Sequence, residues 1–187
     1  MQRITTKLAA VAAIAATMTA GGAIAVAHDG DNGKDRGSSG SHRFHATLTG
    51  YEEVPPISTP ASGSFKATIN RAGDRVSWKL SYRDFETPVQ AAHVHFGQPG
   101  VNGGVSAFLC SNLPGAPAGV QACPTSAAKL SGTIRAQDVV GPADQGIAPG
   151  ELGELASAMQ AGVTYVNVHS DAFPNGEIRG QIHPRGR

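Results

Sequence analysis

Glycine and proline interrupt this sequence so often that long helices are excluded from most of it. The chain has 24 glycines and 12 prolines in 187 residues, and the apolar runs between them are short. Short runs bounded by turn residues are typical of β-strands. Apolar and polar residues alternate in the runs Arg43–Thr49, Gly63–Asn70 and Arg75–Tyr82. The last two flank a turn signal at residues 71–74, so they predict one antiparallel hairpin with a buried face.

Five further runs have strand character, and one segment has helical spacing. The helical segment is Pro149–Ala161, in which Leu152, Leu155 and Met159 recur at helical intervals and Gly162 suits the end of the helix. The strand candidates are Val89–Phe96, Val105–Leu109, Lys129–Arg135, Val163–His169 and Gly176–Ile182. We therefore predict a mostly β domain, an antiparallel Greek-key sandwich or barrel of about eight strands with one short helix.

The amino-terminal region differs in composition from the rest of the chain. Residues 1–27 combine two early basic residues, an Ala-rich apolar stretch and a small-residue pattern at Ala25–Ala27, which predicts a cleaved signal peptide. A retained membrane anchor is the alternative, since about 20 apolar residues can span a bilayer. Residues 28–41 are rich in Gly, Ser and charges and predict a flexible spacer. Residues 42–187 then form one β domain, and the mature protein is expected to be extracytoplasmic.

Charge and cysteine content restrict the partners and the compartment. The formal net charge is +1 and no basic run is interleaved with aromatic residues, so nucleic acid is not an expected partner. The membrane is expected as a partner only if the amino-terminal segment is retained. Cys110 and Cys123 are the only cysteines, and in an exported chain they predict a disulfide.

The histidines are the residues most suited to chemistry. His93 and His95 lie two apart in a predicted strand, so both side chains project from one face, and His169 ends another strand. Three neutral imidazoles would suit one copper or zinc ion. Asp171 could bind the outer N–H of a ligating histidine or the metal itself. The alternative is a polar face whose histidines bind backbone groups or water.

Two other features are weaker candidates. Glu52 and Glu53 precede two prolines in a stiff extended loop, and Glu53 could reach a neighbouring site or remain solvated. Cleavage after Ala27 would leave His28 at a free amino terminus, an arrangement that chelates Cu(II). The sequence has no Gly-x-Ser-x-Gly elbow, no phosphate-binding glycine loop of the usual form and no His-Glu-x-x-His motif.

Several of these segments occur together in one known family. The order is residues 48–56 (LTGYEEVPP), 91–97 (AAHVHFG), 100–103 (GVNG), 165–169 (YVNVH) and 176–180 (GEIRG). Together they resemble the CHRD (chordin-type) domain, from about Phe44 to Ile182. The resemblance implies an extracellular domain and supplies no catalytic residues.

A more distant resemblance concerns mechanism. The stretch around His93 and His95 is similar to the copper-binding strand of Cu/Zn superoxide dismutases, and the strand ending at His169 is similar to another ligand strand. That resemblance implies that these three histidines occupy copper-type positions. The sequence departs from the dismutases because no histidine lies between residues 97 and 169, so the zinc loop is missing, and because the two cysteines are close together.

Three functions are consistent with the sequence. The favoured one is an exported protein that binds a transition metal through His93, His95 and His169. The second is a non-catalytic extracellular module that binds a protein or a cell-surface polymer. The third, a single-copper redox enzyme of dismutase type, is the least favoured, so an enzyme is not the leading expectation.

Overall fold

The computed structural model describes residues 42–185, which form a β domain. Nine strands are present in this part of the chain, with one α-helix and three short 3₁₀ helices. The strands are β1 His42–Thr49, β2 Ser62–Ile69, β3 Val76–Arg83, β4 Val89–Phe96, β5 Gly104–Ser111, β6 Ala128–Ile134, β7 Thr164–Ser170, β8 Ile178–Gln181 and β9 His183–Pro184. The helices are η1 Gly50–Glu52, η2 Ala136–Asp138, η3 Ala143–Gln145 and α1 Leu152–Gln160.

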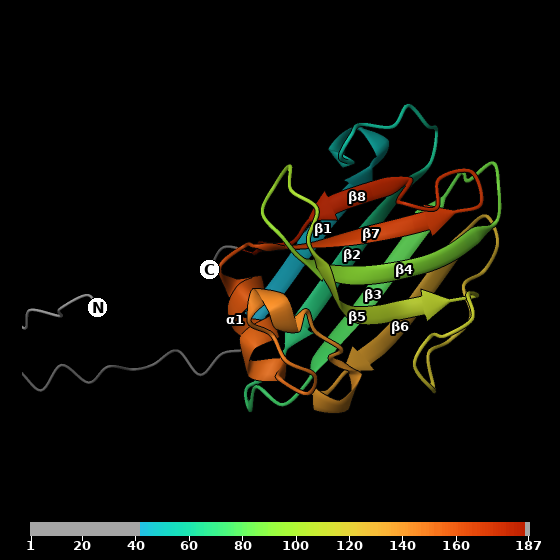
Figure 1. The fold of residues 1–187 in the computed structure, drawn as a ribbon. Helices are drawn as coiled ribbons and strands as arrows, with labels where there is room; N and C mark the ends of the chain where they lie inside the picture. Colours follow the sequence, from blue (N-terminus) through green and yellow to red (C-terminus); the bar gives the residue numbers. More distant parts are fainter. Residues whose placement is uncertain (1–41, 186–187) are drawn as a thin grey trace, which may run out of the picture. The chain divides into compact units, whose positions relative to one another are not determined.

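The strands form one antiparallel sheet that curls into a nearly closed barrel. The strand order is β5-β4-β7-β8-β1-β2-β3-β6, and the short strand β9 also pairs with β1. Figure 1 shows β5, β4, β7 and β8 in front of β1, β2, β3 and β6, so the barrel has two opposed halves. The predicted antiparallel β architecture with one short helix is confirmed.

Contacts between β5 and the segment around β6 narrow the remaining opening. Ala107 on β5 forms an isolated bridge with Val139, which follows β6. The side-chain amide of Gln121 donates hydrogen bonds to the carbonyls of Leu109 on β5 and Ser131 on β6. The predicted disulfide joins Cys110 on β5 to Cys123 in the segment between β5 and β6. These links replace the continuous backbone ladder that would close the barrel.

Alternation of residues along the strands builds the core. In β3, for example, Val76, Trp78, Leu80 and Tyr82 are buried, whereas the residues between them face outward. The predicted hairpin of residues 63–82 is β2 and β3, with Phe65 opposite Leu80. One apolar cluster joins the inward residues of both halves of the barrel to the buried side chains of α1.

Two predicted elements begin two or more residues later than expected. The helix was expected from Pro149 but begins at Leu152, because Gly150 takes a φ of +91° and the Glu151 carboxylate accepts a hydrogen bond from the Ala148 N–H. The strand predicted at Gly176–Ile182 is shortened to β8, Ile178–Gln181, because Gly176 has a φ of +127° that interrupts extended backbone.

The described residues contain no helix that is both long and apolar enough to cross a membrane. The predicted signal peptide and spacer, with His28, lie outside the described residues.

Candidate metal centre

The three candidate histidines lie on two neighbouring strands. In the antiparallel pair of β4 and β7, His93 lies opposite Asn167, His95 opposite Tyr165, and Ala91 opposite His169. These positions alternate with Val94, Val166 and Val168, which are buried in the apolar core. The histidines therefore share the face that points away from the core. One potential ligand nitrogen from each of the three lies within 4.8 Å of the others.

Backbone carbonyls orient two of the imidazoles. His95 Nδ1 lies 3.0 Å from the carbonyl oxygen of Gly103, and His169 Nδ1 lies 2.9 Å from that of Pro174. A carbonyl only accepts hydrogen bonds, so each Nδ1 carries the hydrogen and each Nε2 keeps its lone pair. His169 Nε2 lies 3.1 Å from His93 Nδ1, which places both nitrogens inside the cluster. His95 Nε2 is buried without a hydrogen-bond partner.

Aromatic side chains enclose the cluster. The ring of Phe108 on β5 meets the His93 ring edge to face, with 4.5 Å between the ring centres. The Tyr165 ring stacks on the His95 ring with 4.7 Å between the ring centres and an interplanar angle of 8°. His93 and His95 are each only 8% exposed. Burial disfavours the imidazolium form, and with the neighbouring histidines it lowers the pKa of His93 to about 3.

The same cause acts on the other two histidines. Burial lowers the pKa of His95 to about 4, although its hydrogen bond to Gly103 opposes the change. Burial also lowers the pKa of His169, opposed by the Pro174 carbonyl. All three imidazoles are therefore neutral near pH 7, the form that binds a metal.

Arg179 on β8 packs against Tyr165, which together with Phe108 forms the aromatic wall of the histidine cluster. Its guanidinium carbon lies 3.4 Å from the centre of the Tyr165 ring, so Arg179, Tyr165 and His95 form a stack. The guanidinium also donates hydrogen bonds to the carbonyls of Gln98 and Val101. Arg179 is 2% exposed and holds the loop between β4 and β5 against the site. That loop contains Gly103, the partner of His95.

Glu53 lies beside this arrangement. Its carboxylate is buried and accepts a hydrogen bond of 2.7 Å from Asn167 Nδ2, on the same strand as His169. Burial raises the pKa of Glu53 to about 7, although the positive charge of Arg179 and the Val54 backbone N–H act to lower it. Glu53 thus reaches the region of the histidines, but its oxygens are not among the gathered ligand atoms.

Gly176 makes room for that contact. A Cβ atom at this position would lie 2.3 Å from Asn167 Nδ2 and 2.7 Å from Glu53 Oε1. The next residue, Glu177, is also buried, and its carboxylate accepts hydrogen bonds from the hydroxyls of Thr59 and Ser170. Glu177 therefore ties together the loops before β2 and after β7, which adjoin the site.

Asp171 occupies a different environment from the histidines. It is exposed, and its Oδ1 accepts a hydrogen bond of 2.7 Å from Gln90 Nε2. The outer N–H of His169 binds the Pro174 carbonyl instead of a carboxylate. The group of ligand atoms found in residues 42–185 consists of His93, His95 and His169 alone.

Sequence reasoning missed several supporting residues. Tyr165, Phe108 and Arg179 contact the cluster or its wall, and Gly103 and Pro174 orient two imidazoles through their carbonyls. Tyr165, Asn167 and His169 alternate along one strand, a pattern that indicates a shared face but was used only for His169. No sequence pattern identifies which loop carbonyl an imidazole will meet.

The chain was also compared with known proteins. A protein-family model, the CHRD domain, matches residues 44–182. The chain belongs to the CHRD family. Every residue of the histidine cluster and its wall lies within the CHRD domain, as do both cysteines. No curated protein and no solved structure matches the chain.

Proposed function

We propose that this CHRD-domain protein is exported and binds one copper or zinc ion through His93, His95 and His169. The observation that carries the proposal is the convergence of three neutral imidazoles whose ligand atoms lie within 4.8 Å of one another. Imidazole nitrogen is a preferred ligand of both metals. The disulfide supports the extracytoplasmic part of the proposal, because disulfides are typical of oxidising compartments.

The residues present fit such an ion. The buried lone pair of His95 Nε2 has no partner, a cost that coordination would remove. Nδ1 of His93 and Nε2 of His169 face each other, and carbonyls fix the outer nitrogens of His95 and His169, as is usual for metal-binding histidines. The bound ion would act as a Lewis acid or, if copper, as a redox centre.

The number of ligands bears on whether the site is catalytic. Three protein ligands leave a further position for water or a small ligand, the arrangement typical of catalytic zinc sites. Structural sites are usually closed by four. The proposed site therefore differs from a purely structural one. If the bound ion is copper, a redox activity of dismutase type should be measured once binding is established.

The test is calorimetric titration with Cu(I), Cu(II) and Zn(II) of the chain from Ser41 to Arg187, which omits His28. We expect one tight site per chain for at least one ion, and its loss in a variant with His93→Ala and His95→Ala. His183→Ala is the matched control, because His183 is exposed on β9. Equal affinity in the parent and the double variant, with circular dichroism showing both folded, would refute the site.

A further inference from the structure

The half of the barrel opposite the histidines carries a second distinctive surface. On the outward face of β1, β2, β3 and β6, the exposed charged residues are Arg43, Lys66, Lys79, Arg83 and Lys129. These four strands contain no aspartate or glutamate. We call this outward face of β1, β2, β3 and β6 the basic face. The chain's net charge is only +1, so the basic face is a local concentration of charge that the total conceals.

The strand register aligns the basic residues with hydroxyl groups. One row across the sheet contains His45, Lys66, Lys79 and Ser131, each opposite the next. The adjacent row contains Thr47, Ser64, Ser81 and Lys129 in the same order of strands. Neighbouring strands are about 4.8 Å apart, so each row is about 14 Å long. The result is a grid of ammonium groups and hydroxyls on the outward side of the barrel.

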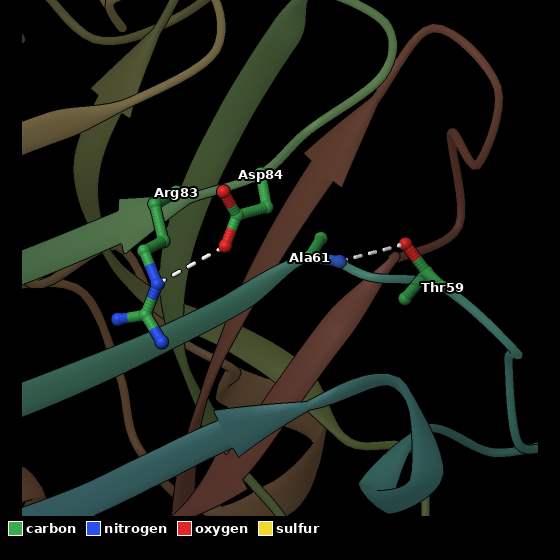
Figure 2. A network of polar contacts seen from close by, with 4 residues as sticks. All are labelled: Thr59, Ala61, Arg83 and Asp84. Carbon is green, nitrogen blue, oxygen red and sulfur yellow. Dashed lines mark hydrogen bonds and ion pairs between the residues drawn. The ribbon is translucent and has the colours of Figure 1, made fainter.

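Lys66 and Lys79 are directly opposite each other, which is unfavourable for the isolated domain. Like charges at opposed positions of antiparallel strands repel. Among residues 42–185 the one ion pair joins Arg83 to the adjacent Asp84, at 3.0 Å (Figure 2), so no carboxylate pairs with the lysines. The lysine pair therefore remains free to attract an external anion.

Two grooves lie over this grid. One, of about 580 Å³, is lined by Thr47, Ser64, Ser81, Arg83 and Lys129 among others. Another, of about 350 Å³, shares Ser64, Ser81 and Lys129 with it and continues to Lys66 and Lys79. The two grooves thus form one path across the strands.

We propose that the basic face binds a linear anionic polysaccharide, an extended chain of sugars that bears sulfate, phosphate or carboxylate groups. Ammonium groups would pair with the repeated anions, and the Ser and Thr hydroxyls would exchange hydrogen bonds with sugar hydroxyls. Single-stranded nucleic acid is less suited, since it stacks its bases on aromatic side chains. Trp78 and Tyr82, the Trp and Tyr of these strands, are buried in the core. The proposal does not depend on metal binding at the histidines.

The test measures binding of dextran sulfate and polygalacturonate to the protein, with neutral dextran as the blank. At about 0.1 M salt, we expect Lys66→Gln with Lys79→Gln to weaken binding of at least one polyanion by about tenfold or more. The matched control is Arg71→Gln with Arg75→Gln, which removes the same charge from the exposed turn between β2 and β3. Because all four side chains are exposed, the melting temperature should confirm that both variants are folded.

Three results would overturn the proposal. The first is that neither polyanion binds the parent protein more tightly than neutral dextran does. The second is an equal loss of affinity in the lysine variant and the arginine control, which would indicate attraction to total charge and not to the basic face. The third is that duplex DNA or vesicles of anionic lipid bind as tightly as the polysaccharides at equal salt.

Discussion

The buried carboxyl group of Glu53 gives a quantitative prediction. Glu53 is 6% exposed, and its pKa is raised from the ordinary 4.5 to about 7, chiefly by burial. Well below pH 4.5, the group is protonated in both the folded and the unfolded chains, so it has little effect on stability. Between pH 4.5 and 7 the unfolded chain loses this proton while the folded chain keeps it, and stability falls as the pH rises.

The magnitude follows from the two pKa values. One pH unit of difference corresponds to about 1.4 kcal/mol, so ionised Glu53 lowers the free energy of unfolding by up to about 3 kcal/mol above pH 7. Glu53→Gln removes the charge but keeps an oxygen that can accept the hydrogen bond from Asn167. We therefore expect the variant to equal the parent at about pH 3.5 and to become more stable than it by up to about 3 kcal/mol at about pH 8.

The assay is urea unfolding of metal-free protein at several pH values, followed by circular dichroism. The buried histidines also change stability with pH, but they are present in both proteins, and the difference between parent and variant largely removes their effect. Glu52→Gln removes the neighbouring exposed carboxylate and is the control. A variant that is less stable than the parent at pH 8 would refute the reasoning, because the attraction of Arg179 would then outweigh the cost of burial.

Two further predictions concern the links around the site. Replacing Cys110 with serine should lower the free energy of unfolding by up to about 3 kcal/mol, because the bridge to Cys123 closes a short loop. Denaturation with and without a reductant measures this change in stability. Metal affinity should stay unchanged in the same variant. Arg179→Gln should weaken metal affinity by about 10-fold to 100-fold and speed amide hydrogen exchange in the loop at residues 97–103, because the stack on Tyr165 and the bonds to Gln98 and Val101 are lost. Unchanged exchange in that loop would contradict the role given to Arg179.

The sequence predicted the strands well because their residues alternate. In residues 63–82 the pattern identified the buried face and the turn, so the hairpin of β2 and β3 was predicted within one residue at each end. The helix was predicted from the spacing of Leu152, Leu155 and Met159, but its first residue depended on the backbone of Gly150. A positive φ in a loop has no periodic signal, so boundaries of this kind were missed.

The candidate metal centre was predictable only in part. The spacing of His93 and His95 placed both on one face, since alternate residues of a strand point the same way. The pairing of β4 with β7 brings His169 to His93, 76 residues away in the sequence, and is decided by the order of strands in the barrel. The contribution of Arg179 through Tyr165 depends on the same order, because β8 must lie next to β7.

The basic face shows the division most clearly. The sequence alone determined that residues such as Lys66 and Lys79 lie on the outward side of their strands, because their neighbours are apolar and must be buried. It also determined an almost neutral total charge, which gave no reason to expect an anionic partner. Only the tertiary structure placed the basic residues of four strands side by side on one face. The physical reason is that alternation fixes the side of a strand on which a residue lies, whereas the neighbours across a sheet depend on which strands pair and in which register.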